Sequence, residues 1–260
     1  MIDIHCHILP GIDDGAKDMK EALKMARIAQ SEGIKTIINT SHYHPDFDKE
    51  SIEKVSKEAE NFNKALKENN IDLEVLTGNE LYYSDELLDQ IAKSKIYTLN
   101  GSKYVLIEFS HVKFPEKLCE IIYEFKLKGY KPILAHVERY AEVQKNPGII
   151  YDAIQEGALV QVNASSVVNK SLGSLNSTCE TLMRQNMVHF VGTDAHGSEN
   201  RRPLMKDAYQ HVCNKYKPGT ANKLFIENPK SVIKDEDIDT SKAIDPSEKK
   251  GFLSKIFKNF

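Results

Sequence analysis

The sequence lacks three features that would each define a class of protein: a long apolar segment, an excess of basic residues and closely spaced cysteines. A membrane-spanning helix needs about 18 or more consecutive apolar residues, and no such run occurs. The first ten residues hold no apolar run led by Lys or Arg, so we expect no signal peptide and a cytoplasmic protein. The formal net charge of −3 gives no support for nucleic-acid binding.

The four cysteines, Cys6, Cys119, Cys179 and Cys213, form no C-x-x-C pair and no tight disulfide framework. A reducing compartment is therefore expected. Enzymes that attack phosphate with a thiolate carry Arg six positions after the cysteine, and none of these four cysteines does. Cys179 comes nearest, with Arg184 five residues later, but it lies in a helical pattern. We therefore expect no cysteine catalysis.

Seven short apolar runs typical of strands alternate with helical patterns along the chain. The strand candidates are residues 2–8, 35–41, 73–80, 104–109, 132–137, 159–164 and 188–194. The helical patterns cover residues 18–33, 50–70, 114–129, 146–157 and 176–186. Seven strands with helical crossovers predict an α/β fold with a parallel sheet, closed as an incomplete or irregular TIM-like (β/α) barrel. A doubly wound open sheet is the competing architecture.

Residues 1–234 are interpreted as one domain, since they contain no internal repeat and no low-complexity linker. Residues 235–260 differ, because a polar linker leads into a short basic ending, KKGFLSKIFKNF. Phe252, Ile256 and Phe260 recur every four residues there, as on one face of a helix. One interpretation is a final helix packed on the barrel, or a frayed end. The other is a weak anchor to the anionic inner face of a membrane.

The first strand candidate, IDIHCHI, places Asp3, His5 and His7 on one face and apolar side chains on the other. Two histidines on one strand face can aim ring nitrogens at a single metal ion. The alternative is a solvated edge strand whose histidines have no role.

Polar side chains also collect at the carboxyl ends of the other strand candidates, and these ends converge on one rim of a barrel. They are His5, His7, Asp13, Asp14, His42, His44, Glu80, Glu108, His136, Asp194 and His196. So many charged groups at one rim would be hard to desolvate unless cations bind there. The set is too large for one tetrahedral ion, and mixed imidazole and carboxylate ligands suit Mn²⁺, Fe²⁺ or Zn²⁺. Cys6 points to the opposite face of its strand and is left out.

These segments together resemble the ordered motifs of the polymerase-and-histidinol-phosphatase (PHP) superfamily. The motifs are IDIHCHILPGIDDG, TSHYHP, GNELYY, LIEF, AHVERY and VGTDAH, and they cover most of residues 2–202. The sequence is most similar to the manganese-dependent tyrosine-protein phosphatases of bacterial capsular and exopolysaccharide operons. LIEF is informative, because many members of the superfamily carry His where this chain has Glu108.

The resemblance implies a distorted seven-stranded barrel with a three-metal centre that holds Mn²⁺, with Fe²⁺, Zn²⁺ or Co²⁺ as alternatives. The implied ligands are His5, His7, Glu80 and Asp194 for the first metal, Glu80, Glu108 and His136 for the second, and Asp14, His42 and His196 for the third. Asp13 and His44 are the alternatives at the third metal.

The same resemblance implies that Arg139 and Arg201 bind phosphate, with Arg202 as the alternative to Arg201. Arginine offers a bidentate fork that suits phosphate oxygens. A different interpretation of Arg139 is a surface salt bridge to Glu138 or Glu142.

The implied reaction is hydrolysis of phosphotyrosine on a protein, by a hydroxide that the metals make available near neutral pH. Asp14 or a metal-bound histidine is the candidate general acid for the leaving oxygen. The implied substrate is the tyrosine-rich tail of a cognate bacterial tyrosine kinase that controls polysaccharide synthesis. One alternative is a small-molecule phosphatase such as histidinol-phosphate phosphatase, which Glu108 disfavours. A second is a non-catalytic kinase-docking module. A third is a nuclease, which the absence of a basic patch disfavours.

Overall fold

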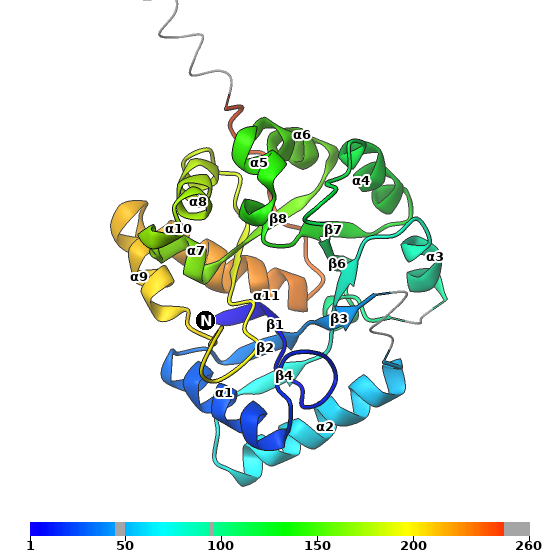
Figure 1. Ribbon diagram of the computed structural model, residues 1–260, viewed down its shortest axis with the longest axis vertical. Helices are drawn as coiled ribbons and strands as arrows, with labels where there is room; N and C mark the ends of the chain where they lie inside the picture. Colours follow the sequence, from blue (N-terminus) through cyan, green and yellow to red (C-terminus); the bar gives the residue numbers. More distant parts are fainter. Residues whose placement is uncertain (45–49, 94–95, 247–260) are drawn as a thin grey trace, which may run out of the picture.

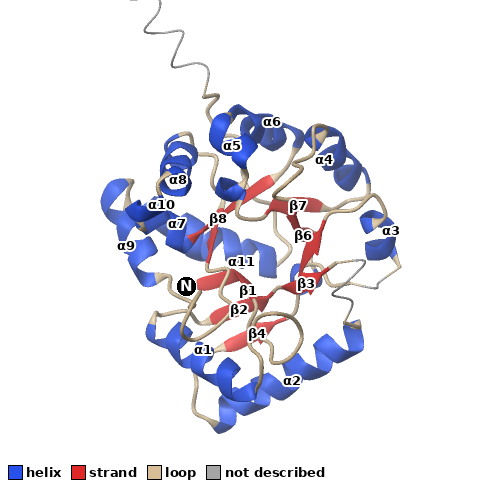
Figure 2. Ribbon diagram, in the orientation of Figure 1, coloured by secondary structure: helices blue, strands red, loops and turns tan. Residues whose placement is uncertain are grey.

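The computed structural model describes residues 1–44, 50–93 and 96–246, and within them nine parallel strands form two sheets. The first sheet has the order β1 (Ile2–Cys6), β2 (Thr36–Asn39) and β4 (Glu74–Leu76). The second sheet has the order β3 (Ser41–Tyr43), β5 (Asn79–Tyr82), β6 (Tyr104–Glu108), β7 (Lys131–Leu134), β8 (Leu159–Asn163) and β9 (Phe190–Gly192). Helices lie around the outside of the strands (Figures 1 and 2). The expected parallel α/β architecture is confirmed.

The expected number of seven strands is not confirmed, because two of the expected runs are interrupted. Thr40 separates β2 from β3, and residues 77–78 separate β4 from β5. Thr40 donates its backbone N–H to Cys6 of the first sheet at 2.9 Å and accepts from Glu80 of the second at 3.2 Å. A Cβ on Gly78 would lie 2.9 Å from Leu99, so the break between β4 and β5 requires a residue without a side chain. Each run therefore crosses from one sheet to the other.

The two sheets also meet where the first and last strands lie side by side. The backbone N–H of Asp194 donates to His5 at 2.7 Å, and that of His7 donates to Ala195 at 2.9 Å. The strands thus surround a common interior, and their carboxyl ends face one rim (Figure 2). Residues almost two hundred positions apart in the sequence are brought together there.

The five expected helices are α1 (Met19–Ser31), α2 (Ile52–Glu68), α4 (Leu118–Leu127), α6 (Gly148–Glu156) and α8 (Ser174–Arg184). Side chains cap the first two at their N-termini: Asp18 accepts from the backbone N–H of Glu21 at 2.8 Å, and Ser51 from that of Lys54 at 3.2 Å. Each helix buries a set of mostly apolar side chains.

The expected set omitted several shorter helical segments. They are α3 (Leu87–Ala92), α5 (Ala141–Lys145), α7 (Ala164–Val168), α9 (Lys206–Lys215), α10 (Pro218–Asn222), the π-helical turn η4 (Lys223–Glu227), α11 (Asn228–Ile233) and the 3₁₀ turns η1 (Leu99–Gly101), η2 (Val137–Arg139) and η3 (Lys170–Leu172). Most are too short to show a periodic apolar pattern. The described residues contain no helix whose length and apolar character would let it cross a membrane.

The beginning of the expected polar linker lies against the amino ends of β6 and β7. The backbone N–H of Lys103 donates to the Asp235 side chain at 2.8 Å, and the Tyr104 hydroxyl donates to the Glu236 carbonyl at 2.5 Å. Lys131 forms an ion pair with Asp237 at 2.7 Å. The expected basic ending, residues 249–260, lies outside the described residues.

Candidate metal centre

The carboxylate of Glu80 lies at the middle of the rim and faces four imidazole rings. Its Oε2 atom is 3.2 Å from His5 Nε2, 3.3 Å from His7 Nε2 and 3.2 Å from His42 Nδ1. Its Oε1 atom is 3.0 Å from His136 Nε2. The side chains of Glu80, His5, His7 and His136 are at most 1% exposed. One buried carboxylate therefore links residues from four strand ends.

Asp194 supplies a second carboxylate from the end of β9. Its Oδ1 atom lies 3.5 Å from His5 Nε2 and 3.6 Å from His196 Nδ1. Asp194 and His136 both adopt left-handed backbone conformations, with φ of 51° and 33°. Such conformations are uncommon for residues other than glycine and persist at functional sites when the surroundings hold them.

A third group, at the more open side of the rim, combines His7, Asp14, His42 and His196. The Asp14 Oδ1 atom lies 3.5 Å from His42 Nε2 and 3.4 Å from His196 Nε2. The Asp14 side chain is 66% exposed, so this part of the centre faces solvent.

The structure separates the residues that the sequence left as alternatives. Asp13 lies behind the rim: its Oδ2 atom is 2.7 Å from His7 Nδ1 and accepts the backbone N–H of His42 at 2.9 Å. Asp14, by contrast, faces the imidazole nitrogens. The ring of His44 packs on Tyr82 at 4.5 Å, and His44 is in none of the groups of potential ligands among the described residues.

Glu108 and His136 meet a further histidine that sequence reasoning missed. Glu108 Oε1 lies 3.4 Å from His136 Nε2 and 3.4 Å from His111 Nε2. The His111 ring stacks on that of His136, with centroids 5.6 Å apart. His111 lies three residues after Glu108, in the loop that follows β6, and this short spacing could have indicated that the two side chains meet.

Three of the histidines share a pattern that suits metal ligation. His5 Nδ1 lies 3.1 Å from the Gln161 side-chain oxygen, His7 Nδ1 lies 2.7 Å from Asp13, and His196 Nδ1 lies 3.1 Å from the Asp194 carbonyl. Each of these acceptors fixes the proton on Nδ1 and leaves the Nε2 lone pair available. All three Nε2 atoms are buried and have no hydrogen-bond partner.

Buried polar atoms without partners are costly, and a bound cation would satisfy these nitrogens. Five groups of three or four His, Asp and Glu side chains bring their ligand atoms within 4.8 Å of one another in the described residues, and none includes a cysteine. The residues present therefore fit a centre of several divalent metals. Imidazole and carboxylate donors without thiolate are typical of Mn²⁺, Fe²⁺ and catalytic Zn²⁺ sites.

The electrostatics of the rim keep its carboxylates ionised. Burial opposes ionisation of Glu80, but the charge of His5 and the hydrogen bond from His136 hold its pKa well below the ordinary value. For Glu108, burial is likewise outweighed by hydrogen bonds from His111 and His136, which lower its pKa to about 2. Ionised carboxylates are the form that binds metal.

Two buried amides on β8 hold these groups in place, and sequence reasoning missed both. The Gln161 side-chain oxygen accepts the backbone N–H of His136 at 2.7 Å as well as the His5 ring N–H. Its amide donates to Asn163 at 2.9 Å, and Asn163 donates to Asp194 at 2.9 Å. Two polar residues on one face of an otherwise apolar buried strand were the signal.

The two arginines expected to bind phosphate both contact Asp194. Arg139 Nη1 lies 3.2 Å from Asp194 Oδ2, and Arg201 Nη2 lies 2.6 Å from Asp194 Oδ1. The partner of Arg139 is thus Asp194, while buried Glu138 accepts the backbone N–H of Asn163 at 3.0 Å. The arginine side chains are 36% and 46% exposed, so both guanidinium groups lie where the centre opens to solvent.

Cavity walls also place Arg202 near this edge of the centre. A cavity of about 330 Å³ is lined by Asp194, Arg201 and Arg202 among others.

None of the groups of potential metal ligands in the described residues contains a cysteine. Burial also raises the pKa of the Cys6 and Cys179 thiols well above the ordinary value.

Residues 1–234 match the sequence profile of a family described as "Capsular polysaccharide synthesis, CpsB/CapC". The chain belongs to the CpsB/CapC family. It is 35% identical to the tyrosine-protein phosphatase YwqE of Bacillus subtilis over 238 residues, which cover 92% of this chain and 93% of YwqE. It is 31% identical to the tyrosine-protein phosphatase CpsB of Streptococcus pneumoniae over 241 residues, covering 91% of this chain and 99% of CpsB.

Solved structures agree with this membership. A structure from the work on YwqE of Bacillus subtilis and CpsB of Streptococcus pneumoniae, described as metal-dependent tyrosine phosphatases, superposes with a TM-score of 0.90 at 34% identity. The superposition covers 94% of this chain and 99% of the chain in that structure. The histidinol phosphate phosphatase of Lactococcus lactis shares the fold, with a TM-score of 0.56 at 13% identity over 86% of this chain and 94% of that chain.

Proposed function

We propose that this protein is a manganese-dependent protein-tyrosine phosphatase. The observation that carries the proposal is the buried Glu80 carboxylate within 3.0–3.3 Å of four imidazole nitrogens, two of which, Nε2 of His5 and of His7, make no hydrogen bond. The relatives YwqE and CpsB, named tyrosine-protein phosphatases, align over nearly their whole lengths. Within the same proposal, the fold is a distorted barrel of the PHP type.

The proposed ligand sets overlap with the groups of neighbouring side chains at the rim but do not coincide with them. His5, His7, Glu80 and Asp194 would hold the first metal, Glu80, Glu108 and His136 the second, with His111 in reach of Glu108, and Asp14, His42 and His196 the third. When bound, these metals would supply hydroxide near neutral pH and positive charge for the phosphate oxygens. Mn²⁺ is our choice of metal, with Fe²⁺, Zn²⁺ and Co²⁺ as alternatives.

The chain's own side chains would bind and orient the phosphate. Arg139 and Arg201 are held at the open edge by Asp194, so their remaining N–H groups can donate to phosphate oxygens. Asp14 is exposed at the same edge, and the His196 imidazole, whose Nε2 lies 3.4 Å away, lowers its pKa. Its ionised form favours a role as ligand over that of proton donor, and a phenolate leaving group needs little protonation.

The proposed substrate is phosphotyrosine in a flexible segment of a bacterial tyrosine kinase that controls capsular or extracellular polysaccharide synthesis. The family description and the names of the relatives support this choice. The protein would act in the cytoplasm, at the inner face of the membrane if residues 249–260 bind anionic lipid. A histidinol-phosphate phosphatase remains the alternative activity.

The test compares hydrolysis of a phosphotyrosine peptide with that of histidinol phosphate, each with Mn²⁺ and with excess EDTA. We expect rapid, EDTA-sensitive hydrolysis of the peptide and little of histidinol phosphate. Iodoacetamide should leave activity intact, since Cys6 and Cys179 are buried and none of the groups of potential metal ligands in the described residues contains a cysteine. Activity that resists EDTA but is lost on alkylation would contradict the metal mechanism.

A further inference from the structure

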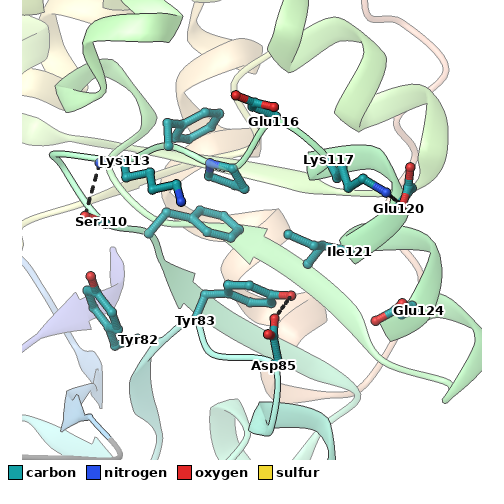
Figure 3. A pocket seen from close by; sticks show the side chains of 13 residues that line it. Tyr82, Tyr83, Asp85, Ser110, Lys113, Glu116, Lys117, Glu120, Ile121 and Glu124 are labelled. Atoms are coloured by element: carbon teal, nitrogen blue, oxygen red, sulfur yellow. Dashed lines mark hydrogen bonds and ion pairs between the residues drawn. The ribbon is translucent and has the colours of Figure 1, made fainter.

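A groove of about 710 Å³ lies next to the metal centre, between the ends of β5 and β6 and helix α4. Its lining includes Tyr82, the last residue of β5, and Tyr83 after it, Phe109 and Ser110, which follow β6, and Ile121 of α4 (Figure 3). None of these residues belongs to the ligand groups of the centre. The groove is therefore a separate feature.

The groove begins where a ligand strand ends. Tyr82 is the strand partner of Glu108, and the backbone N–H of Tyr83 donates to the Glu108 carbonyl at 2.9 Å. The loop after Glu108 carries Ser110 into the groove wall, and the next residue, His111, turns back to the Glu108 carboxylate at 3.4 Å. A chain segment whose phosphorylated side chain reached the metals would thus extend directly into the groove.

The floor of the groove is aromatic and apolar. The ring of Phe109 packs against those of Tyr83 and Phe114, with centroids 5.4 Å and 5.7 Å away. Ile121 lies at the α4 side of the same floor (Figure 3). This surface suits an apolar side chain of a bound polypeptide.

The rim of the groove is acidic. Four acidic side chains line it, Asp85, Glu116, Glu120 and Glu124, against two basic ones, Lys113 and Lys117. Lys117 already pairs with Glu120 at 2.9 Å, and Asp85 accepts from the Tyr83 hydroxyl at 3.4 Å. Glu116 and Glu124 are exposed and add negative charge at the two sides of the rim. A positively charged ligand complements this rim.

We propose that the groove binds the substrate polypeptide beside its phosphotyrosine, in an extended conformation, and selects an apolar side chain for the floor and Lys or Arg for the Glu120–Glu124 edge. This inference rests on the proposed phosphatase function and adds a sequence preference to it. The contribution to specificity comes from outside the metal centre, so it should change peptide binding and leave the chemistry on the phosphate unchanged.

The test exchanges charge on both partners. Two phosphotyrosine peptides differ only in carrying Arg or Glu at the positions that flank the phosphotyrosine, and each is also made with a non-hydrolysable phosphonate for fluorescence anisotropy. The enzyme variant is Glu120→Lys/Glu124→Lys, in which both substituted residues are exposed. The matched control is Glu227→Lys, an exposed residue of η4 that does not line the groove.

We expect the unmodified protein and the Glu227→Lys control to favour the Arg peptide by about tenfold in KM and in anisotropy Kd. The double variant should lose or invert that preference while hydrolysing free phosphotyrosine at an unchanged rate. The Arg peptide also carries one apolar residue near the phosphotyrosine, and replacing that residue by Ser should raise KM as well. Equal affinity of the unmodified protein for both peptides, or an unchanged preference in the double variant, would overturn the groove assignment. Failure to hydrolyse any phosphotyrosine compound, with the binding preference intact, would instead overturn the phosphatase function alone.

Discussion

Oδ2 of Asp13 lies 2.7 Å from Nδ1 of His7, while Nε2 of the same ring lies 3.3 Å from Glu80. Burial favours the neutral ring of His7, but the charge and hydrogen bond of Asp13 outweigh it and raise the His7 pKa well above the ordinary value. In the metal-bound protein the same contact would fix the ring's orientation and the proton on Nδ1.

Asp13→Asn should therefore weaken Mn²⁺ binding and activity by roughly ten- to a hundredfold, although Asp13 faces away from the centre. Metal titration followed by elemental analysis measures the effect, and circular dichroism checks the fold. Asp152→Asn, at an exposed position on α6, is the control and should bind metal normally. Normal metal affinity in Asp13→Asn would contradict the positioning role.

Gln161→Leu should also lower metal affinity by about ten- to a hundredfold, because His5, His136 and Asn163 all lose a partner. The free energy of unfolding should fall by roughly 1–3 kcal/mol, since the backbone N–H of His136 is left buried without an acceptor. Gln161→Glu keeps the acceptor oxygen and loses only the donor to Asn163, so its backbone contact to His136 should survive. If the two variants lost metal equally, the acceptor oxygen would not be the decisive atom.

Arg139→Ala should retain its metal and lose about a hundredfold in kcat/KM, because it removes a donor to phosphate. His136→Ala and Glu80→Ala should instead lose metal and turnover together, since both residues face the other ligands directly. Arg139→Lys should recover little activity, because an ammonium lacks the planar fork. Loss of metal from the Arg139 variant with retention in the His136 variant would reverse these assignments.

His189, which directly precedes the amino end of β9, should make the fold sensitive to acid. Its ring is buried and accepts the backbone N–H of Val160 at 3.2 Å, and burial lowers its pKa to about 3. The unfolded chain binds a proton near pH 6.5 and the folded chain does not, so its contribution to stability is complete above pH 6.5 and falls as the pH drops toward 3.

At pH 5 this difference amounts to about 2 kcal/mol. His189→Asn can keep an acceptor for Val160 but cannot titrate, so its free energy of unfolding should decrease less between pH 7.5 and pH 5. Urea unfolding of both proteins in EDTA measures the two slopes. Identical pH dependence in the two proteins would show that His189 stays neutral in both states.

The gathering of these side chains at one rim could be predicted, because alternation along a strand tells which side chains share a face and the ends of parallel strands lie at one edge. His5 and His7 share a face since they are two residues apart, and Glu80, Asp194 and His136 follow apolar runs whose ends converge. The choice between Asp13 and Asp14 could not be made in this way, because adjacent loop residues have no fixed periodicity. Only the turn itself, with Gly15 donating to Asp13 at 3.0 Å, decides which carboxylate faces the rim.

The interrupted strands and the helices after Asp194 were less predictable for a different reason. The break at Thr40 depends on hydrogen bonds to Cys6 and Glu80, which are distant in the sequence. The helices α10 and α11 are 5 and 6 residues long, so neither spans two turns of an apolar pattern. His111 lies in a loop, where no alternation points to the side chain's direction.

The pairing of β1 with the segment after β9 sets the time at which the centre can form during synthesis. His5 leaves the ribosome almost two hundred residues before Asp194, although the two side chains lie 3.5 Å apart in the folded protein. Contacts so distant in the sequence form slowly and late in folding. A nascent chain that ends before Asp194 lacks one of the proposed ligands, so the complete set of proposed ligands can assemble only after that segment has been synthesised.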